Sequence, residues 1–324
     1  MNFQDLKTVG TPDFYLDVAI KRTKKRIEES RDVGLRGSPI QRSKTIELTK
    51  LETIEMEIKN QLYNVLKSYP SLDNLPEFYQ ELIRVTLDYG MLKKSLGAMM
   101  WCIEKNHKFL NQYKGKIKMS TEPARINQYR REFLGRVSST LKQIKENLAY
   151  LEEARKTMQD YPSIKTGIPT IAIAGFPNVG KSTLLSKITT AKPKIAPYAF
   201  TTQGINLGYA EYQGKKIQFM DTPGTLSRFE KQNNIEKVAT LAMKYLAEAV
   251  IYVFDPTESY PIEKQVELYE LTKSSTRPMI LYLSKTDVAD KKSIEKFTKM
   301  FKGIITNTDD LKKEIEKLKF FEWD

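Results

Sequence analysis

The stretch TIAIAGFPNVGKST, residues 170–183, decides the fold of the second half of this chain. A five-residue apolar run precedes the pattern GxxxxGK[ST], which Gly175 and Gly180 frame, and the apolar start of a helix follows. This arrangement is typical of a P-loop, because its glycines let backbone N–H groups close around phosphate oxygens at a helix N-terminus. The predicted phosphate-binding residues here are Gly175, Pro177, Asn178, Val179, Gly180, Lys181, Ser182 and Thr183.

A magnesium ion is predicted beside this loop. Lys181 would neutralise the β- and γ-phosphates, while the Ser182 hydroxyl would bind Mg²⁺. Asp221 begins the sequence DTPG after an apolar strand, so its carboxylate would hold Mg²⁺ through water and the N–H of Gly224 would meet the γ-phosphate. Thr202, in the sequence YAFTT, is favoured over Thr201 as the hydroxyl that completes the metal shell. A Thr-rich start of a strand is the alternative explanation for this pair.

The sequence SKTD, residues 284–287, follows another apolar strand and predicts a base pocket. Asp287 can accept two hydrogen bonds from guanine N1–H and the 2-amino group, which adenine cannot supply, and an unpaired buried carboxylate penalises the wrong base. The stem of Lys285 would lie along the base plane. Taken alone, SKTD would be a solvent-exposed cluster at the end of a strand.

The two halves of the chain differ in hydrophobic period. Apolar residues recur at helical spacing up to residue 160, with one stripe from Leu134 to Leu151 that predicts a single helix over 122–160. After residue 161, short apolar runs alternate with helical stretches, which predicts a mostly parallel six-stranded sheet with helices on both faces. We therefore expect a helical-bundle domain at 1–163 and an α/β domain at 164–324.

The predicted strands are 170–174, 205–212, 216–220, 249–254, 279–283 and 303–305.

Composition narrows the class of protein. The chain has 324 residues, 40% of them hydrophobic, and a net charge of +13, which fits two globular domains and excludes collagen-like or disordered chains. One cysteine, Cys102, and one histidine, His107, leave too few ligands for a zinc cage and argue against a Ser-His-Asp triad. With no apolar run long enough to span a bilayer and no leader, we expect a cytoplasmic protein, a monomer by default.

Positive charge is concentrated in the helical half. Residues 1–165 hold 30 basic and 21 acidic side chains, a net charge of +9, and the window 84–136 holds twelve basic and four acidic ones. Tyr113 and Tyr129 interleave with these cations, a pattern that suits phosphates and unstacked RNA bases. A solvated face of a Lys-rich protein is the alternative. The predicted RNA-binding residues are Lys114, Lys116, Lys118, Arg125, Arg130, Arg131 and Arg136.

Together, GFPNVGKS, YAFTT and DTPG resemble the motifs of Obg-related GTPases, with a Ras-like P-loop G domain. A helical domain of this length before them is similar to the nucleolar GTP-binding protein family in its short form. The resemblance implies a Mg²⁺-dependent GTP hydrolase that alternates between GTP and GDP in assembly of the large ribosomal subunit, with rRNA as partner. Lys181, Thr202 and Gly224 would then serve catalysis. The competing readings are a GTPase whose helical domain docks proteins or membrane, and a nucleotide-dependent scaffold with little hydrolysis.

Three positions depart from the family pattern. Ser284 stands where the base motif normally has Asn, which predicts a weaker link to the P-loop or the base. The last guanine loop normally reads Ser-Ala, and its best match here is Thr306-Asn307. Thr225 stands where Ras-like proteins carry a water-orienting Gln, so slow intrinsic turnover is expected.

Asn178 occupies the position at which some related GTPases bind K⁺, and a turn-stabilising side chain is its plainer role.

Overall fold

The chain forms two compact units that are both discontinuous in sequence. The computed structural model describes residues 3–32, 37–165, 167–189, 194–198, 201–221, 234–257, 260–273 and 277–318. The helical unit consists of Gln4–Asn74 and Leu87–Gln159. The sheet unit consists of Met1–Phe3, Leu75–Thr86 and Asp160–Asp324.

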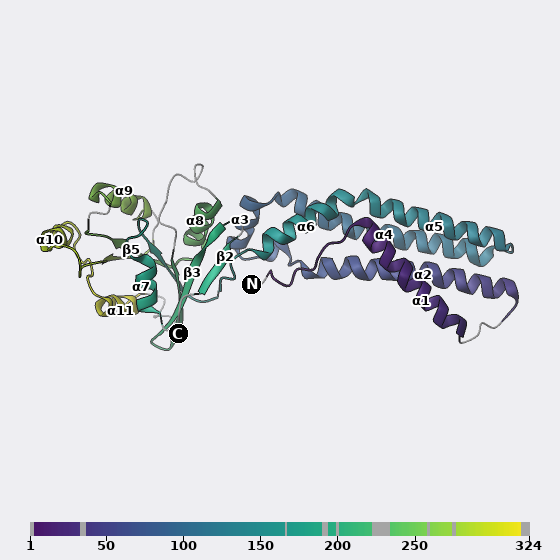
Figure 1. Ribbon diagram of the computed structural model, residues 1–324, viewed down its shortest axis with the longest axis horizontal. Helices are drawn as coiled ribbons and strands as arrows, with labels where there is room; N and C mark the ends of the chain where they lie inside the picture. Colours follow the sequence, from purple (N-terminus) through teal and green to yellow (C-terminus); the bar gives the residue numbers. More distant parts are fainter. Residues whose placement is uncertain are drawn as a thin grey trace. The chain divides into compact units, whose positions relative to one another are not determined.

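Long helices packed side by side build the helical unit (Figure 1). Their apolar stripes form its core, for example the buried stripe from Leu51 to Val65 on the second helix. Ser38 starts the second helix with a capping box, because its hydroxyl accepts from the Gln41 N–H while the Gln41 side chain accepts from the Ser38 N–H. The helices are α1 (Pro12–Asp32), α2 (Pro39–Ser68), α4 (Tyr89–Met119), α5 (Pro123–Gln143) and α6 (Lys145–Gln159), with the 3₁₀ turn η1 (Leu72–Asn74).

The predicted single helix over 122–160 is wrong, because the chain leaves the helical conformation at Ile144, where φ is −96° and ψ is 13°. Ile144 is nevertheless buried, and so are Val137 before it and Leu148 after it. The apolar stripe therefore continues across the break, and hydrophobic period alone does not reveal the interruption. Among the described residues, no helix combines the length and the apolar character needed to cross a membrane.

The sheet unit contains a six-stranded sheet with strand order β2-β3-β4-β1-β5-β6. β1 pairs in parallel with β4 and β5, and β5 with β6, whereas β3 pairs antiparallel with β2 and β4. The mostly parallel sheet is thus confirmed. The strands are β1 (Thr170–Ala174), β2 (Lys194–Tyr198), β3 (Thr201–Tyr212), β4 (Lys215–Asp221), β5 (Ala249–Phe254) and β6 (Met279–Leu283).

Helices cover both faces of this sheet, as predicted. Alternate residues of β5 point to opposite faces, so Ile251 and Val253 pack with α7 and α11, while Phe254 packs its ring against rings of α9 and α10. The carboxyl ends of β1, β4 and β6 lead into the predicted motifs GFPNVGKST, DTPG and SKTD. The helices of this unit are α3 (Glu77–Thr86), α7 (Lys181–Ile188), α8 (Asn234–Leu246), α9 (Ile262–Lys273), α10 (Lys291–Met300) and α11 (Thr308–Glu316).

Three strand predictions differ from the structure by more than one residue, and the first is β3, which begins at Thr201 and not at residue 205. β2 was not predicted, because KIAPY lacks alternation and carries a proline; the pairing with β3 shifts register between Ala196 and Tyr198, around that proline, on the edge of the sheet. The predicted strand 303–305 is wrong. Gly303 has φ +81°, which interrupts an extended chain, and Ile305 makes only an isolated bridge to Tyr282.

Helix α3 comes from the helical half of the sequence but folds with the sheet unit, where it packs against α8. Its residues Phe78, Tyr79, Leu82 and Ile83 are buried. The Tyr79 hydroxyl donates to the carbonyl of Pro162 at 2.8 Å, so it fixes the segment that leads into β1. The predicted domain boundary after residue 163 groups α3 with the other N-terminal helices. In the structure, the apolar face of α3 packs within the sheet unit instead.

The substitution Tyr79→Ala tests this assignment of α3. Tyr79 is 0% exposed and its ring lies edge-on to Phe3 and Phe78, so its loss should lower the free energy of unfolding of the sheet unit by about 3–5 kcal/mol. Urea unfolding of the full chain measures the effect. Tyr63→Ala, at a side chain 42% exposed on α2, is the matched control and should change little. Equal effects of the two substitutions would contradict the assignment.

Candidate functional site

The loop between β1 and α7 has the backbone conformation of a phosphate cradle. Gly175 has φ +145° and Gly180 has φ +95°, and the non-glycine Asn178 between them has φ +60°. A Cβ on Gly175 would lie 2.5 Å from the carbonyl oxygen of Val253, which leaves no room for a side chain. The two glycines are therefore required by the path of the chain. Val179 is buried, Pro177 is half-buried, and Asn178 and Thr183 are exposed.

Lys181 lies at the first position of α7 with its ammonium folded over the loop. Its Nζ donates to the carbonyl oxygens of Gly175 at 3.0 Å and Phe176 at 2.6 Å, and the side chain is 7% exposed. Burial lowers the pKa of Lys181 to about 8, although the charge of Asp221 acts in the opposite direction. A cation with so little hydration is stabilised when an anion enters the loop.

Asp221, the last residue of β4, meets the start of α7. Its Oδ2 accepts from the Ser182 hydroxyl at 2.5 Å and from the Asn206 side-chain amide at 3.1 Å. Asp221 is 7% exposed, and its Oδ1 is buried with no hydrogen-bond partner among the described residues. A buried carboxylate oxygen of this kind is costly unless a donor or cation satisfies it.

Oxygen ligands of this kind fit Mg²⁺. The hard cation prefers carboxylate, hydroxyl and water oxygens, and it usually keeps several waters beside one or two protein ligands. Ser182 and Asp221 supply one hydroxyl and one carboxylate at the entrance of the P-loop. Two of the three residues predicted for the metal from sequence, Ser182 and Asp221, are thus brought together.

Asn206 is a residue that the sequence prediction missed. It lies on β3 directly opposite Asp221 in the antiparallel register with β4. Only this strand pairing places its amide beside the carboxylate, and pairing register is not visible in a single sequence. A polar side chain between the apolar residues Ile205 and Leu207 was the signal available in the sequence.

The base motif is tied to the P-loop through Ser284. This side chain is 6% exposed, and its hydroxyl has two acceptors within reach, the carbonyl oxygens of Val179 at 2.6 Å and Phe254 at 2.9 Å. Ser284 therefore reaches the P-loop, while a weaker link to the base than Asn would give stays a prediction. Close approach of the two loops makes up for the shorter side chain, since a Cβ on Gly180 would lie 3.6 Å from the Cβ of Ser284.

The remaining base-pocket residues lie at the same edge of the sheet. Lys285 has φ +50° and its ammonium pairs with Asp255, while Asp287 is exposed at the end of the loop. Thr306 is half-buried just after the bridge between Ile305 and β6. Asn307 caps α11, because its Oδ1 accepts from the Asp310 N–H at 2.8 Å. Guanine recognition by Thr306 and Asn307 stays a prediction.

Three residues with predicted roles, Thr202, Gly224 and Thr225, lie wholly or in part outside the described residues. Thr202 belongs to β3, and its side chain lies outside the described residues. Gly224 and Thr225 also lie outside them. Their roles in binding the γ-phosphate or in turnover remain predictions.

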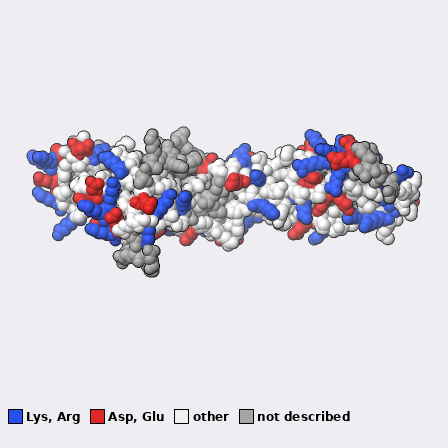
Figure 2. Space-filling view, turned by 90° about the horizontal axis from the view of Figure 1, so that it is seen from below, with Lys and Arg blue, Asp and Glu red and all other residues white. Residues whose placement is uncertain are grey.

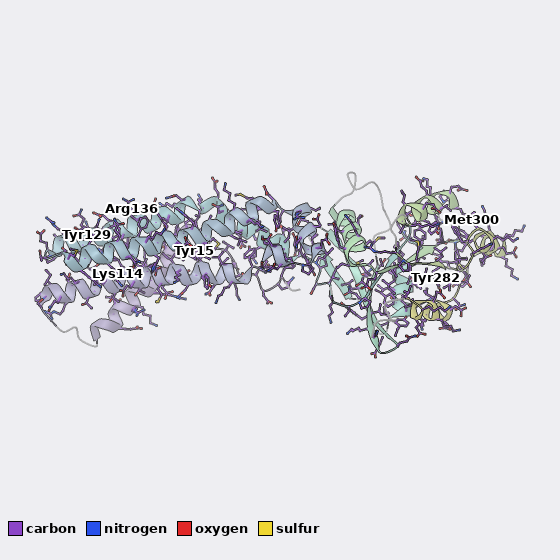
Figure 3. All side chains as sticks on the ribbon, turned by 180° about the vertical axis from the view of Figure 1, so that it is seen from behind. Tyr15, Lys114, Tyr129, Arg136, Tyr282 and Met300 are labelled. Carbon is purple, nitrogen blue, oxygen red and sulfur yellow. The ribbon has the colours of Figure 1, made fainter. Side chains whose placement is uncertain are left out.

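The predicted RNA-binding cations lie on α4 and α5 of the helical unit, and they divide into three groups. Three are paired with carboxylates, at N–O distances of 2.6 Å for Lys114–Glu52, 3.0 Å for Arg125–Glu122 and 2.9 Å for Arg130–Glu47. Lys116 lies over the rings of Tyr113 and Tyr129, and Arg136 over Phe109. Figure 3 shows Tyr129 and Arg136 on α5 and Lys114 on α4. No carboxylate partner of Lys118 or Arg131 occurs among the described residues.

Comparison with known proteins agrees with both halves of the chain. Residues 3–165 match the family of the NOG1 N-terminal helical domain, and residues 170–285 match the 50S ribosome-binding GTPase family. A Methanocaldococcus jannaschii protein, MJ1408, whose function is uncharacterised, is 37% identical over 90% of this chain and 83% of its own length. Nucleolar GTP-binding protein 1 of Drosophila melanogaster is 30% identical over 89% of this chain.

The chain spans 44% of the length of that Drosophila protein. Among solved structures, a GDP·AlF₄⁻-bound Era of Aquifex aeolicus is 28% identical, covering 46% of this chain and 56% of that chain with a TM-score of 0.38. The helical-domain match covers half of the present chain, and the archaeal relative aligns with most of it. The chain therefore belongs to the nucleolar GTP-binding protein (NOG1) family of P-loop GTPases.

Proposed function

We propose that this chain is a Mg²⁺-dependent GTPase switch that acts in assembly of the large ribosomal subunit. The observation that carries the proposal is the Asp221 carboxylate, whose Oδ2 is held by Ser182 and Asn206 and whose buried Oδ1 has no partner among the described residues. Beside it, Lys181 is a buried cation at the mouth of a phosphate-shaped loop. The match to a 50S ribosome-binding GTPase family supports the ribosomal role.

Different residues of the chain would contact the phosphates, the magnesium ion and the γ-phosphate. Backbone N–H groups at the start of α7 would bind phosphate oxygens, and the Lys181 ammonium would exchange the carbonyls of Gly175 and Phe176 for the β- and γ-phosphates. Bound Mg²⁺ supplies positive charge that stabilises the transferred phosphoryl group, with Ser182 and Asp221 holding it. Thr202 and Gly224 would respond to the γ-phosphate and change position after hydrolysis.

Intrinsic turnover should be slow. Thr225 cannot orient the attacking water as a glutamine does, so Lys181 and Mg²⁺ would provide charge stabilisation without a dedicated base. A partner that completes the site would then set the rate, which suits a switch whose GTP state has to persist during an assembly step.

Lys181→Ala tests the nucleotide site. Removing the ammonium eliminates charge-assisted hydrogen bonds to the phosphates, so affinity for GDP should fall about 100-fold. The measurement is the shift in melting temperature with GDP, GTP, ADP and ATP, since only a true ligand stabilises the folded state strongly. Lys187→Ala, at an exposed lysine on the same helix, is the control and should retain the guanine-specific shift. Unchanged GTP hydrolysis by Lys181→Ala would contradict the proposed site.

Potassium is proposed as an accessory cation at Asn178, whose side chain is exposed on the P-loop with φ +60°. A monovalent cation there would add positive charge near the β- and γ-phosphates, in place of an arginine finger. GTP turnover should then be several-fold faster in KCl than in NaCl at equal ionic strength. Asn178→Ala should remove the difference, and equal wild-type rates in the two salts would exclude the idea.

Ribosomal RNA is proposed as the partner of the helical unit. Lys118 and Arg131 lack carboxylate partners among the described residues, which suits contacts to phosphates. Lys116 lies over the rings of Tyr113, which is buried, and Tyr129, which is half-buried, so the Tyr129 ring is the one partly open to a stacked base. Figure 2 shows acidic side chains interspersed with basic ones on the face in view, so we expect a small number of phosphate contacts rather than a uniformly positive face. Docking of proteins or of an anionic membrane by the same helices is the alternative.

Charge reversal at the cations without carboxylate partners tests the RNA surface. The double variant Lys118→Glu/Arg131→Glu should weaken binding to a large-subunit rRNA fragment and reduce the slope of log affinity against log salt by about 1 for each lost contact. Arg125→Glu, at a cation already paired with Glu122, is the control and should have the smaller effect. Wild-type binding that is insensitive to salt, or binding to anionic vesicles in preference to the RNA, would contradict the proposal.

A further inference from the structure

A fully buried carboxylate lies beside the base pocket. Asp255 directly follows β5, and Lys285 lies two residues beyond the end of β6. The two strands are parallel neighbours with Phe254 paired to Leu283, so both residues emerge at the same edge of the sheet. Asp255 is 0% exposed, although the loop that contains it carries none of the predicted motifs.

Both oxygens of Asp255 are occupied. Oδ2 accepts from the Lys285 ammonium at 2.7 Å, and Oδ1 accepts from the backbone N–H and the hydroxyl of Thr257 at 2.9 and 2.6 Å. Burial raises the pKa of Asp255, but the hydrogen bonds from Lys285 and Thr257 more than offset this and hold the pKa below its ordinary value. The carboxylate is therefore ionised at neutral pH and pairs with a cation.

The backbone of Asp255 is fixed as well. Gln265 of α9 is 1% exposed; its Oε1 accepts from the Asp255 N–H at 2.9 Å, and its Nε2 donates to the carbonyl oxygens of Asp255 at 3.0 Å and Tyr260 at 3.1 Å. The position of the carboxylate is thus determined by a buried side chain of the scaffold. A side chain held at both its backbone and its carboxylate can position another residue with precision.

Lys285 needs such a partner. Its backbone has φ +50°, a left-handed conformation that residues other than Gly, Asn and Asp seldom adopt. Its side chain remains 31% exposed although its ammonium is paired with Asp255, and it lies between Ser284 and Asp287 in the sequence of the base loop. Fixing the ammonium at Asp255 restricts the conformations that this flexible stem can adopt before a ligand arrives.

We propose that Asp255 is a positioning residue for guanine recognition, which anchors Lys285 so that its stem forms a preformed surface for the purine ring. This inference rests on the proposed function, because it assigns the base pocket to the same nucleotide. It also supplies a second anchor to the base loop, besides the Ser284 hydroxyl that occupies the usual position of Asn. Asp287 would then supply the hydrogen bonds that identify guanine, while Asp255 and Lys285 supply the surface against which the purine packs.

A double-mutant cycle tests the coupling. Asp255→Asn keeps the size and the acceptor for Thr257 but removes the charge that holds Lys285, so affinity for GDP should fall about 10-fold. Lys285→Met keeps an aliphatic stem without the ammonium. In the Lys285→Met background, Asp255→Asn should have almost no further effect, because the interaction is already absent. Asp290→Asn, at an exposed helix-capping carboxylate where Asn caps equally well, is the matched control and should leave affinity unchanged.

Binding of inosine diphosphate distinguishes loss of the Lys285 anchor from a general disruption of the base loop. It lacks the 2-amino group that Asp287 would bind but presents the same purine surface, so Asp255→Asn should weaken GDP and inosine diphosphate by the same factor. Loss of the preference for GDP, or independent effects of the two substitutions in the cycle, would show that the whole base loop had moved and would overturn the inference. Unchanged GDP affinity in Asp255→Asn would also overturn it. A wild-type chain that binds no GDP would instead overturn the proposed function, and this inference with it.

Discussion

The close approach of Gly175 to the carbonyl oxygen of Val253 is the constraint on which the rest of the site depends. No side chain fits at this point, so the chain turns directly from β1 over the end of β5 and enters α7 at Lys181. That path places Ser182 against Asp221 and Val179 against Ser284. The P-loop thus meets Asp221, the predicted metal carboxylate, and Ser284 of the predicted base loop at one edge of the sheet.

Polar contacts at this edge are of two kinds. Among the described residues around Ser284, Asp255 and Gln265, each buried polar side-chain atom has a hydrogen-bond partner, so this part of the edge is a rigid polar network. Around Asp221, one buried oxygen has no partner among the described residues, and the neighbouring Lys181 ammonium is held by backbone carbonyls alone. The phosphate side is therefore the part of the site that a ligand would stabilise most.

The features that could be predicted from the sequence are those that depend on residues close together in the chain. The P-loop sequence, the strands β1, β5 and β6 and the nearness of Ser182 to Asp221 follow from spacing and residue type. Asn206 and Asp255 could not be predicted, since each acts through strand pairing or packing that a single sequence does not encode. The break at Ile144 was missed for a related reason, because hydrophobic burial on both sides hides the change in backbone conformation.

The membership of α3 in the sheet unit has a consequence for how this protein can be divided or inherited. The polypeptide passes from one unit to the other four times, near residues 3, 74, 86 and 159. No single cut yields two pieces that each contain a whole core, so a fragment beginning at residue 164 would expose the surfaces that Tyr79 and Leu82 cover. A single crossover between genes could not exchange one unit without splitting the other unit's sequence. We therefore expect the two units to be inherited together, unlike domains that a simple linker joins.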